Sequence, residues 1–255
     1  MTDIARFAEV VDEAARTASA IPQFTQTAPL SVADAYAIQK QSVDRRLKRG
    51  EKLVGVKMGL TSRAKMAQVH VDEVVWGRLT DAMRLEEGAS LSRKDYVHPR
   101  IEPELAFLLK APLTGLVTAA EAMTAVQAIA PAMEIIDSRY QNFKFALPDV
   151  IADNSSSSSF AVGDWSRPDQ DFSNLGLVME VNGRPVEIGS TAAILGNPSR
   201  SLVAAARLAG VALGRLEAGW IILAGGATAA HPLKVGERVR VTMQNLGSVS
   251  IRVTE

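Results

Sequence analysis

From residue 51 onward, the chain is dominated by short β-type segments separated by glycine and proline, and this pattern constrains its fold most strongly. KLVGVKMG at 52–59, IEPELAFLL at 101–109 and AMEIIDSRY at 132–140 are typical of the series. Asn182 and Gly183 separate two further segments and indicate a type I′ hairpin, in which both turn residues have positive φ. Because the segments do not alternate regularly with helices, the pattern predicts a strand-rich body rather than a repeated βαβ fold.

Helical patterns dominate the first fifty residues. Ile4, Phe7, Ala8 and Val11 recur at helical spacing and predict one helix over the first twenty residues. The residues 31–34, Ser-Val-Ala-Asp, form a capping-box pattern that starts a second helix ending near Gly50. Two more helices are expected later in the chain, one capped at 118–121 and one spanning about 199–216. We therefore expect an α+β protein with a helical N-terminal region, residues 1–50, and a β-rich catalytic body, residues 51–255, which can still be one structural domain.

Charge and composition disfavour several classes of partner. Lysine plus arginine and aspartate plus glutamate each number 28, so the net charge is zero and no footprint for nucleic acid or an anionic membrane is expected. No apolar run approaches the roughly 18 residues of a membrane span, and the amphipathic start does not resemble a signal peptide. These features predict a cytoplasmic protein. The sequence has no cysteine, so a metal site would need oxygen or imidazole ligands.

Two glutamates interrupt the apolar segment at 101–109. Side chains alternate along a strand, so Glu102 and Glu104 lie on one face, and their like charges repel unless a cation or a proton intervenes. A divalent cation held by oxygen ligands, Mg²⁺ or Mn²⁺, would remove the conflict. Glu134 is the best candidate for a third ligand, with Asp137 as the alternative. The competing interpretation is an edge strand that faces solvent with arginines opposite the glutamates.

Four further segments accompany this acidic strand: GVKMGLTSRAKM at 55–66, VVWGRLTDAM at 74–83, EIIDSRY at 134–140 and DVIADNSSSSSFAVG at 149–163. Together they resemble the fumarylacetoacetate hydrolase superfamily, in its hydratase and decarboxylase branch, over nearly the whole chain. The resemblance implies a twisted mixed β-roll with a helical N-terminal part. It also implies a Mg²⁺ or Mn²⁺ site built from Glu102, Glu104 and Glu134, with Lys57 at the active centre.

The same resemblance implies an activity. It favours metal-dependent decarboxylation of 2-oxo-3-hexenedioate to 2-hydroxypenta-2,4-dienoate and CO₂, in the meta-cleavage pathway of aromatic catabolism. The metal would chelate the 2-oxo acid and act as a Lewis acid on its C2 carbonyl. The alternatives are hydration of 2-oxopent-4-enoate or hydrolysis of a C–C bond at the same site, or a scaffold subunit without activity. A homo-oligomer, a complex with a partner 2-oxopent-4-enoate hydratase, or both are also implied.

Other residues are candidates for the substrate pocket, although Asp81 and the serines at 155–159 could equally serve in turns or caps, and Lys57 could be a snorkelling lysine at a strand end. Lys57 would hold a substrate carboxylate or relay a proton. We expect the serine run within 153–160 to be a flexible or ligand-lining loop, and Arg100 to pair with a carboxylate of the acidic strand. The cation for the distal carboxylate is left open among Lys57, Arg78, Arg139 and Lys144. The remaining candidates are Asp81 as a second catalytic residue, and Ser155, Ser156, Ser157, Arg139 and Thr228 for substrate binding.

Overall fold

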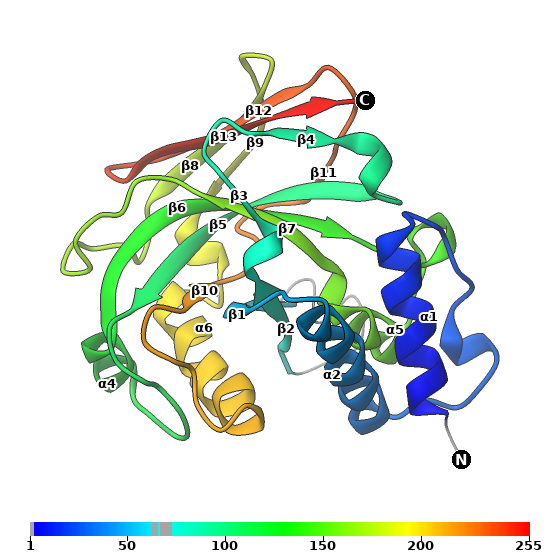
Figure 1. The fold of residues 1–255 in the computed structure, drawn as a ribbon. Coiled ribbons are helices and arrows are strands. Elements are labelled where there is room, and N and C mark those ends of the chain that lie inside the picture. Colours follow the sequence, from blue (N-terminus) through cyan, green and yellow to red (C-terminus); the bar gives the residue numbers. More distant parts are fainter. Residues whose placement is uncertain (1–2, 63–65, 67–72) are drawn as a thin grey trace.

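The computed structural model describes residues 3–62, 66 and 73–255, so residues 63–65 of the GVKMGLTSRAKM segment lie outside the described residues. Two β-sheets form the centre of the molecule. Figure 1 shows the smaller sheet over the long curved strands of the larger one, with most helices on the opposite side. The α+β prediction is confirmed. In the described part of the chain, no helix is both long and apolar enough to cross a bilayer.

The larger sheet has eight strands in the order β2-β1-β10-β5-β6-β7-β3, with β11 paired to β5. Its two longest strands, β5 and β6, are antiparallel, and their register places Glu102 directly opposite Glu134. The short strand β10 is parallel to β1 and antiparallel to β5, so it joins the two halves of the sheet. The strands are β1 (Leu53–Gly59), β2 (Val75–Thr80), β3 (Arg84–Leu85), β5 (Pro99–Leu109), β6 (Val126–Asp137), β7 (Ser157–Val162), β10 (Ile221–Leu223) and β11 (His231–Pro232).

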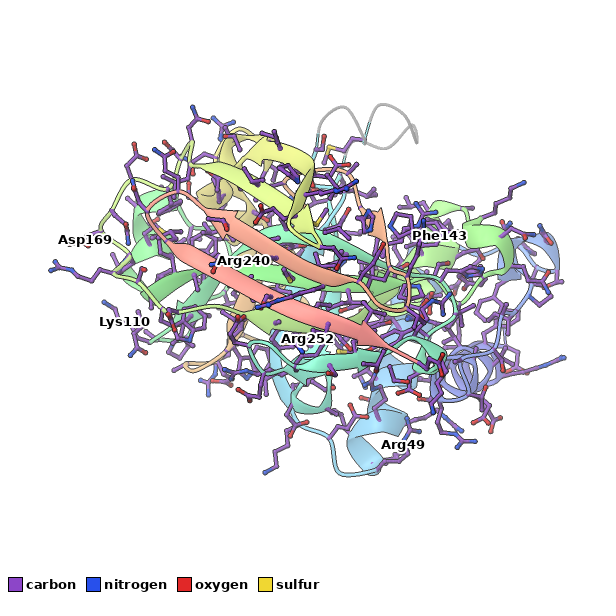
Figure 2. The ribbon with its side chains drawn as sticks, turned by 90° about the horizontal axis from the view of Figure 1, so that it is seen from above. Arg49, Lys110, Phe143, Asp169, Arg240 and Arg252 are labelled. Carbon is purple, nitrogen blue, oxygen red and sulfur yellow. The ribbon has the colours of Figure 1, made fainter. Side chains whose placement is uncertain are left out.

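The smaller sheet covers the outer face of β5, β6 and β7. Val239, Val241 and Ile251 pack with Ile101 and Met133 in a cluster between the two sheets. Figure 2 looks down on this sheet and labels Arg240 and Arg252, whose exposed side chains alternate with the buried valines and isoleucine. The strand order is β4-β13-β12-β8-β9. The strands are β4 (Ser90–Ser92), β8 (Gly176–Val181), β9 (Arg184–Ser190), β12 (Arg238–Met243) and β13 (Gly247–Thr254).

The predicted hairpin at Asn182 and Gly183 is confirmed. The two residues join β8 to β9 with φ values of 51° and 77°. Glycine adopts positive φ without steric cost, and asparagine tolerates it better than most residues. The prediction for the serine run was wrong in part, because Ser157, Ser158 and Ser159 belong to strand β7 rather than to a loop.

The N-terminal helices α1 (Ile4–Arg16) and α2 (Val32–Lys48) pack side by side. Ser31 and Asp34 form the predicted capping box at the start of α2. Apolar residues of both helices share a cluster with Tyr140 and with Val75 of β2. The proposed boundary at residue 50 lies in a turn. The helical N-terminal region and the β-rich body share part of their core across it.

The other helices support the sheet from below in Figure 1. α4 (Ala119–Thr124) has the predicted capping box, and α5 (Leu147–Ala152) packs against α2. α6 (Pro198–Ala205) is capped by Asn197 and continues as a π-helical turn over 206–210. The observed helix therefore begins one residue before the predicted start at about 199. It changes its hydrogen bonding at 206 and ends at 212, before the predicted end at about 216. Short 3₁₀ helices occupy Phe24–Gln26, Asp81–Met83, Arg93–Asp95, Gln141–Phe143, Asn154–Ser156 and Thr191–Ala193.

Candidate metal centre

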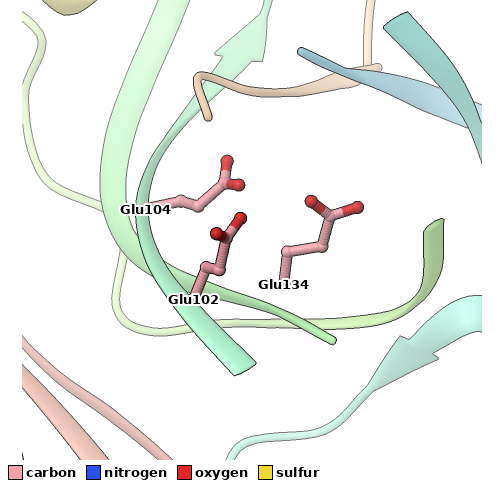
Figure 3. Close-up of side chains that lie close together, drawn as sticks. All are labelled: Glu102, Glu104 and Glu134. Carbon is pink, nitrogen blue, oxygen red and sulfur yellow. The ribbon is translucent and has the colours of Figure 1, made fainter. Parts of the chain in front are cut away.

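Three carboxylates meet where β5 and β6 lie side by side. Glu102 and Glu104 alternate on β5, and Glu134 faces them from β6. One oxygen from each lies within 4.8 Å of the other two, and Figure 3 shows the three side chains converging. Asp137, the alternative third acid, does not belong to this cluster. Its carboxylate instead accepts hydrogen bonds from the backbone N–H groups of Val97 and His98.

Among the described residues, Lys57 forms an ion pair with the cluster. Its Nζ lies 2.9 Å from Oε2 of Glu134 and donates a 3.0 Å hydrogen bond to the carbonyl oxygen of Ser155. Burial alone would lower the pKa of Lys57, but the negative charges of Glu134 and Glu104 outweigh burial and raise the pKa. Lys57 is therefore a buried ammonium group rather than a neutral amine.

The acidic cluster has more negative charge than Lys57 can neutralise. Glu104 and Glu134 are fully buried. Burial and the neighbouring Glu134 charge raise the pKa of Glu104 well above its ordinary value. Burial also raises the pKa of Glu134, although the Lys57 ammonium opposes this effect. Both carboxyl groups therefore take up protons more readily than an exposed glutamate when no other cation compensates them.

Several buried oxygens at this site lack hydrogen-bond partners within the described residues. They include Oε1 of Glu104, Oε1 of Glu134 and the hydroxyls of Ser156 and Ser157. Such oxygens are costly to bury unless a donor or a cation satisfies them. A cluster of three carboxylates, in which Glu104 and Glu134 have unsatisfied buried oxygens, suits a hard divalent cation, which prefers oxygen ligands. The residues present therefore fit a Mg²⁺-type ion.

The loop after β10 lies against the cluster of three glutamates. The backbone N–H of Gly225 donates a 2.7 Å hydrogen bond to Oε2 of Glu104. A Cβ atom at Gly226 would lie 2.8 Å from the carboxyl carbon of Glu102, so a larger residue there would displace the carboxylate. Glycine at 226 thus lets the loop approach the acidic side chains without moving the Glu102 carboxylate.

A cavity of about 460 Å³ opens beside these residues. Its polar lining includes Lys57, Arg100, Glu102, Ser155 and Ser156, and its apolar lining includes Ile136, Phe143, Phe145 and Val150. A cavity lined by both charged and apolar groups suits a small carboxylic acid with a carbon chain.

A larger cavity of about 750 Å³ lies against the other face of β2 and is lined by Tyr36, Trp76 and Arg78. Trp76 and Arg78 pair with Met58 and Val56, whereas Lys57 pairs with Gly77. Because side chains alternate along β1 and β2, Arg78 faces away from the carboxylates. Its guanidinium lies over the Trp76 ring and donates to Gln39. Arg78 is therefore not the cation for a substrate in the smaller cavity.

Two predicted site residues lie outside the cavity. Asp81 is exposed in the 3₁₀ helix after β2, and its carboxylate accepts hydrogen bonds of 2.9 Å from the N–H groups of Lys52 and Ala82. Those hydrogen bonds lower the pKa of Asp81. Arg139 is buried in an ion pair with Asp153 and donates to the carbonyl oxygen of that residue. The assignments of both residues to the site are therefore corrected. Backbone N–H groups engage the Asp81 carboxylate, and Asp153 engages the Arg139 guanidinium.

The other residues predicted to bind substrate differ in whether they line the cavity. Ser155 and Ser156 line the cavity from a turn with positive φ, and the Ser155 hydroxyl donates to the carbonyl oxygen of Trp76. Ser157 is buried at the start of β7. Thr228 donates its hydroxyl to the carbonyl oxygen of Ala229. Its neighbours Gly226 and Ala229, rather than Thr228 itself, line the cavity.

Sequence reasoning missed Arg100 as a candidate for binding substrate. Its guanidinium lies 4.0 Å from the centre of the Phe143 ring at the edge of the cavity. Among the described residues Arg100 makes no ion pair, so the expectation that it pairs with a carboxylate of the acidic strand was wrong. The strand alternation that paired Glu102 with Glu104 also places Arg100 on their face, and that signal could have identified it.

A family comparison agrees with this geometry. The model of the fumarylacetoacetate (FAA) hydrolase C-terminal region matches residues 51–254. The chain belongs to the fumarylacetoacetate hydrolase family. The predicted family and its mixed-sheet fold are thereby confirmed.

Relatives of this fumarylacetoacetate hydrolase family protein include decarboxylases and hydratases. A 4-oxalocrotonate decarboxylase from Pseudomonas sp. is 56% identical over 251 residues, which cover 98% of both chains. A 2-hydroxyhexa-2,4-dienoate hydratase from Comamonas testosteroni is 33% identical and covers 95% of this chain and 94% of its own.

A solved structure is also similar over almost the full length. It is the 4-oxalocrotonate decarboxylase from Pseudomonas putida G7, complexed with magnesium and adipate. It superposes on this chain with a TM-score of 0.95 and 39% identity, covering 99% of this chain and 98% of that chain.

Proposed function

We propose that the protein is a divalent-metal-dependent carboxy-lyase, which converts 2-oxo-3-hexenedioate (4-oxalocrotonate) to 2-hydroxypenta-2,4-dienoate and CO₂. The observation that carries this proposal is the 56% identity to a 4-oxalocrotonate decarboxylase over 98% of the chain. The convergence of three carboxylates beside a cavity supports it independently. The activity belongs to the meta-cleavage pathway of aromatic catabolism.

We propose Glu102, Glu104 and Glu134 as the ligands that would hold Mg²⁺, with Mn²⁺ as an alternative suited to the same oxygen ligands. When bound, the ion would supply a Lewis acid for the C2 carbonyl of a 2-oxo acid. The similar structure complexed with magnesium supports this assignment.

Lys57 is the proposed proton donor. Loss of CO₂ breaks the C5–C6 bond, and the electron pair moves through the conjugated C3=C4 bond to the C2 oxygen, which then takes up a proton. An ammonium group has three N–H donors, and the contacts of Lys57 with Glu134 and Ser155 leave one for this oxygen. The negative charges of Glu134 and Glu104 raise the pKa of Lys57, so Lys57 carries the proton that it would donate.

The alternative function is hydration of 2-oxopent-4-enoate, and the 33% identity to a dienoate hydratase supports it. An assay with both substrates separates the two. Purified protein with Mg²⁺ should release CO₂ from 2-oxo-3-hexenedioate, lose this activity with EDTA and regain it with added Mg²⁺. Consumption of 2-hydroxypenta-2,4-dienoate with the diacid left intact would establish the hydratase instead. If neither substrate reacts, both assignments are refuted, and a scaffold subunit without activity becomes the favoured alternative.

We also propose a cytoplasmic location and assembly into a homo-oligomer, a complex with a 2-oxopent-4-enoate hydratase, or both. Transfer to a hydratase is chemically reasonable because the dienol product is the substrate that such an enzyme hydrates. Light scattering after size-exclusion chromatography, with and without the hydratase, measures both kinds of assembly. A single monomer peak in both runs would contradict them.

A further inference from the structure

We propose that Arg100 binds the distal carboxylate of the substrate and so selects a dicarboxylic 2-oxo acid over a monocarboxylic one. This inference rests on the proposed function, because it assumes that the 2-oxo end of the substrate lies at the three glutamates. It adds the group that recognises the other end of the molecule.

The first reason is the distribution of positive charge. Among the described residues, two cationic side chains line the cavity, Lys57 and Arg100. Lys57 is engaged by Glu134, whereas Arg100 makes no ion pair in the described part of the chain. The other cations considered face elsewhere, since Arg139 is paired with Asp153 and Lys144 is exposed and does not line the cavity.

The second reason is the position of Arg100 relative to the acidic cluster. Arg100, Glu102 and Glu104 occupy alternate positions of β5 and therefore face the same side. Alternate residues of a strand are about 7 Å apart. This spacing matches an extended six-carbon diacid, so a substrate with its 2-oxo end at Glu102 and Glu104 would place its distal carboxylate near Arg100.

The third reason is that the guanidinium is held in place before any ligand binds. It lies over the ring of Phe143, which contacts His98 and Phe145 edge-on at centroid distances of 6.3 Å and 5.4 Å. Phe143 also has a φ of 56°, an uncommon conformation for a bulky residue that the surrounding structure must maintain. Figure 2 labels Phe143 on the side of the molecule where the N-terminal helices lie. A planar guanidinium fixed on an aromatic ring can bind a carboxylate with little loss of entropy.

The proposal distinguishes the two candidate reactions. A monocarboxylic substrate such as 2-oxopent-4-enoate has no group for Arg100, whereas 2-oxo-3-hexenedioate does. The distal carboxylate becomes neutral CO₂ in the reaction, so a cation stabilises the bound substrate at least as much as the transition state. Replacing Arg100 should therefore raise KM far more than it lowers kcat.

The test compares two unreactive ligands by isothermal titration calorimetry of the Mg²⁺-loaded protein. 2-Oxoadipate and 2-oxohexanoate share the 2-oxo acid end and the six-carbon chain, and differ only in the distal carboxylate. The unaltered protein should bind 2-oxoadipate about 30-fold more tightly, as expected for a charge-assisted hydrogen-bonded pair. Arg100→Gln should remove this preference and leave the affinity for 2-oxohexanoate unchanged, and Arg100→Lys should restore part of it.

Lys144→Gln is the matched control, because it removes the same charge from an exposed neighbour of Phe143 and should keep the full preference. Equal binding of the two ligands by the unaltered protein, or a preference that survives Arg100→Gln, would overturn the assignment of Arg100 and leave the proposed function intact. Failure of 2-oxohexanoate to bind in a Mg²⁺-dependent way would instead refute the 2-oxo acid site itself, and the Arg100 assignment with it. Thermal unfolding of each variant verifies that it is folded.

Discussion

At the scale of single residues, the acidic cluster is a compromise between stability and ion binding. Glu104 and Glu134 are fully buried, and Lys57 neutralises one negative charge of the three glutamates. Burying like charges together is unfavourable, and the raised pKa of Glu104 reflects this cost. A bound dication would compensate the negative charge of the carboxylates. An apolar residue in place of one of these glutamates would fill the same space but bind no ion.

Glu104→Gln tests this balance. The amide keeps the oxygen that accepts from Gly225 but removes one charge, so we expect a folded protein whose Mg²⁺ affinity falls by about 100-fold. Its metal-free form should be at least as stable as the unaltered protein, because a buried repulsion is removed. Calorimetric Mg²⁺ titration and thermal unfolding measure the two effects. Glu217→Gln, the same change at a residue outside the cluster, is the control and should alter neither. Unchanged Mg²⁺ affinity in Glu104→Gln would show that this carboxylate is not a ligand.

Site residues could be predicted from the sequence where their positions follow from local rules. They could not be predicted where contacts between distant parts of the folded chain determine the role of a side chain. Strand alternation was sufficient to pair Glu102 with Glu104 on one face. Arg139 and Asp81 looked equally suited to a site, but their contacts with Asp153 and Lys52 arise only in the folded chain. Strand alternation could have indicated Arg100 but was not applied to it, and its contact with Phe143, 43 positions away, had no local signal.

At the scale of secondary-structure elements, the pairing of α1 with α2 depends on a buried carboxylate. Asp12 of α1 is 3% exposed, and Arg49 and Arg45 bind it with N–O distances of 2.6 Å and 3.0 Å. Burial would raise the pKa of Asp12, but the hydrogen bonds from the two arginines outweigh burial and lower it. The ionised form is therefore the one that holds the two helices together.

Asp12→Asn should destabilise the protein by about 1 kcal/mol at pH 7, a modest value because both arginines are partly exposed to solvent. The pKa of Asp12 is lower in the folded state, so its contribution is present above the ordinary value of 3.8 and is lost as the pH falls through the folded value. The stability difference between variant and unaltered protein should therefore shrink below about pH 4. Urea unfolding at several pH values measures it, and a difference independent of pH would refute the ionic interpretation.

Elements with local signals were predicted well. The capping boxes at Ser31 and Thr118 and the turn at Asn182 each depend on neighbouring residues, and all are present. The serine run has no apolar alternation, so its partial strand character was not visible. Residues 157–162 form β7 because β6 lies beside them and supplies hydrogen-bond partners.

At the scale of the whole molecule, metal binding and folding should be coupled, because the proposed ligands come from two strands and become neighbours only when those strands pair. At a free Mg²⁺ concentration of 100 times Kd, the folded state gains about 2.7 kcal/mol. For a chain of this size, the expected rise in Tm is about 5–10 °C. Differential scanning calorimetry with Mg²⁺ and with EDTA measures it. An equal rise in Glu104→Gln would mean that the ion binds elsewhere.

The order of strands could not be derived from sequence patterns. β10, at 221–223, lies between β1 and β5, whose residues precede it by more than one hundred positions. Hydrophobic periodicity identifies a strand but does not show which other strand pairs with it. The resemblance to a known family implied a mixed β-roll, and the match of residues 51–254 confirms the family, but the neighbours of β10 come from the structure.

The alignment of Glu102 with Glu134 also restricts how such a chain can evolve. Sliding β5 past β6 by one position would turn one set of carboxylates toward the opposite surface. Length changes in the connection between Leu109 and Val126 leave the alignment intact, whereas a single insertion between Glu104 and Leu109 shifts it. Natural variants of this protein should therefore accumulate insertions in that connection and almost none within the paired strands.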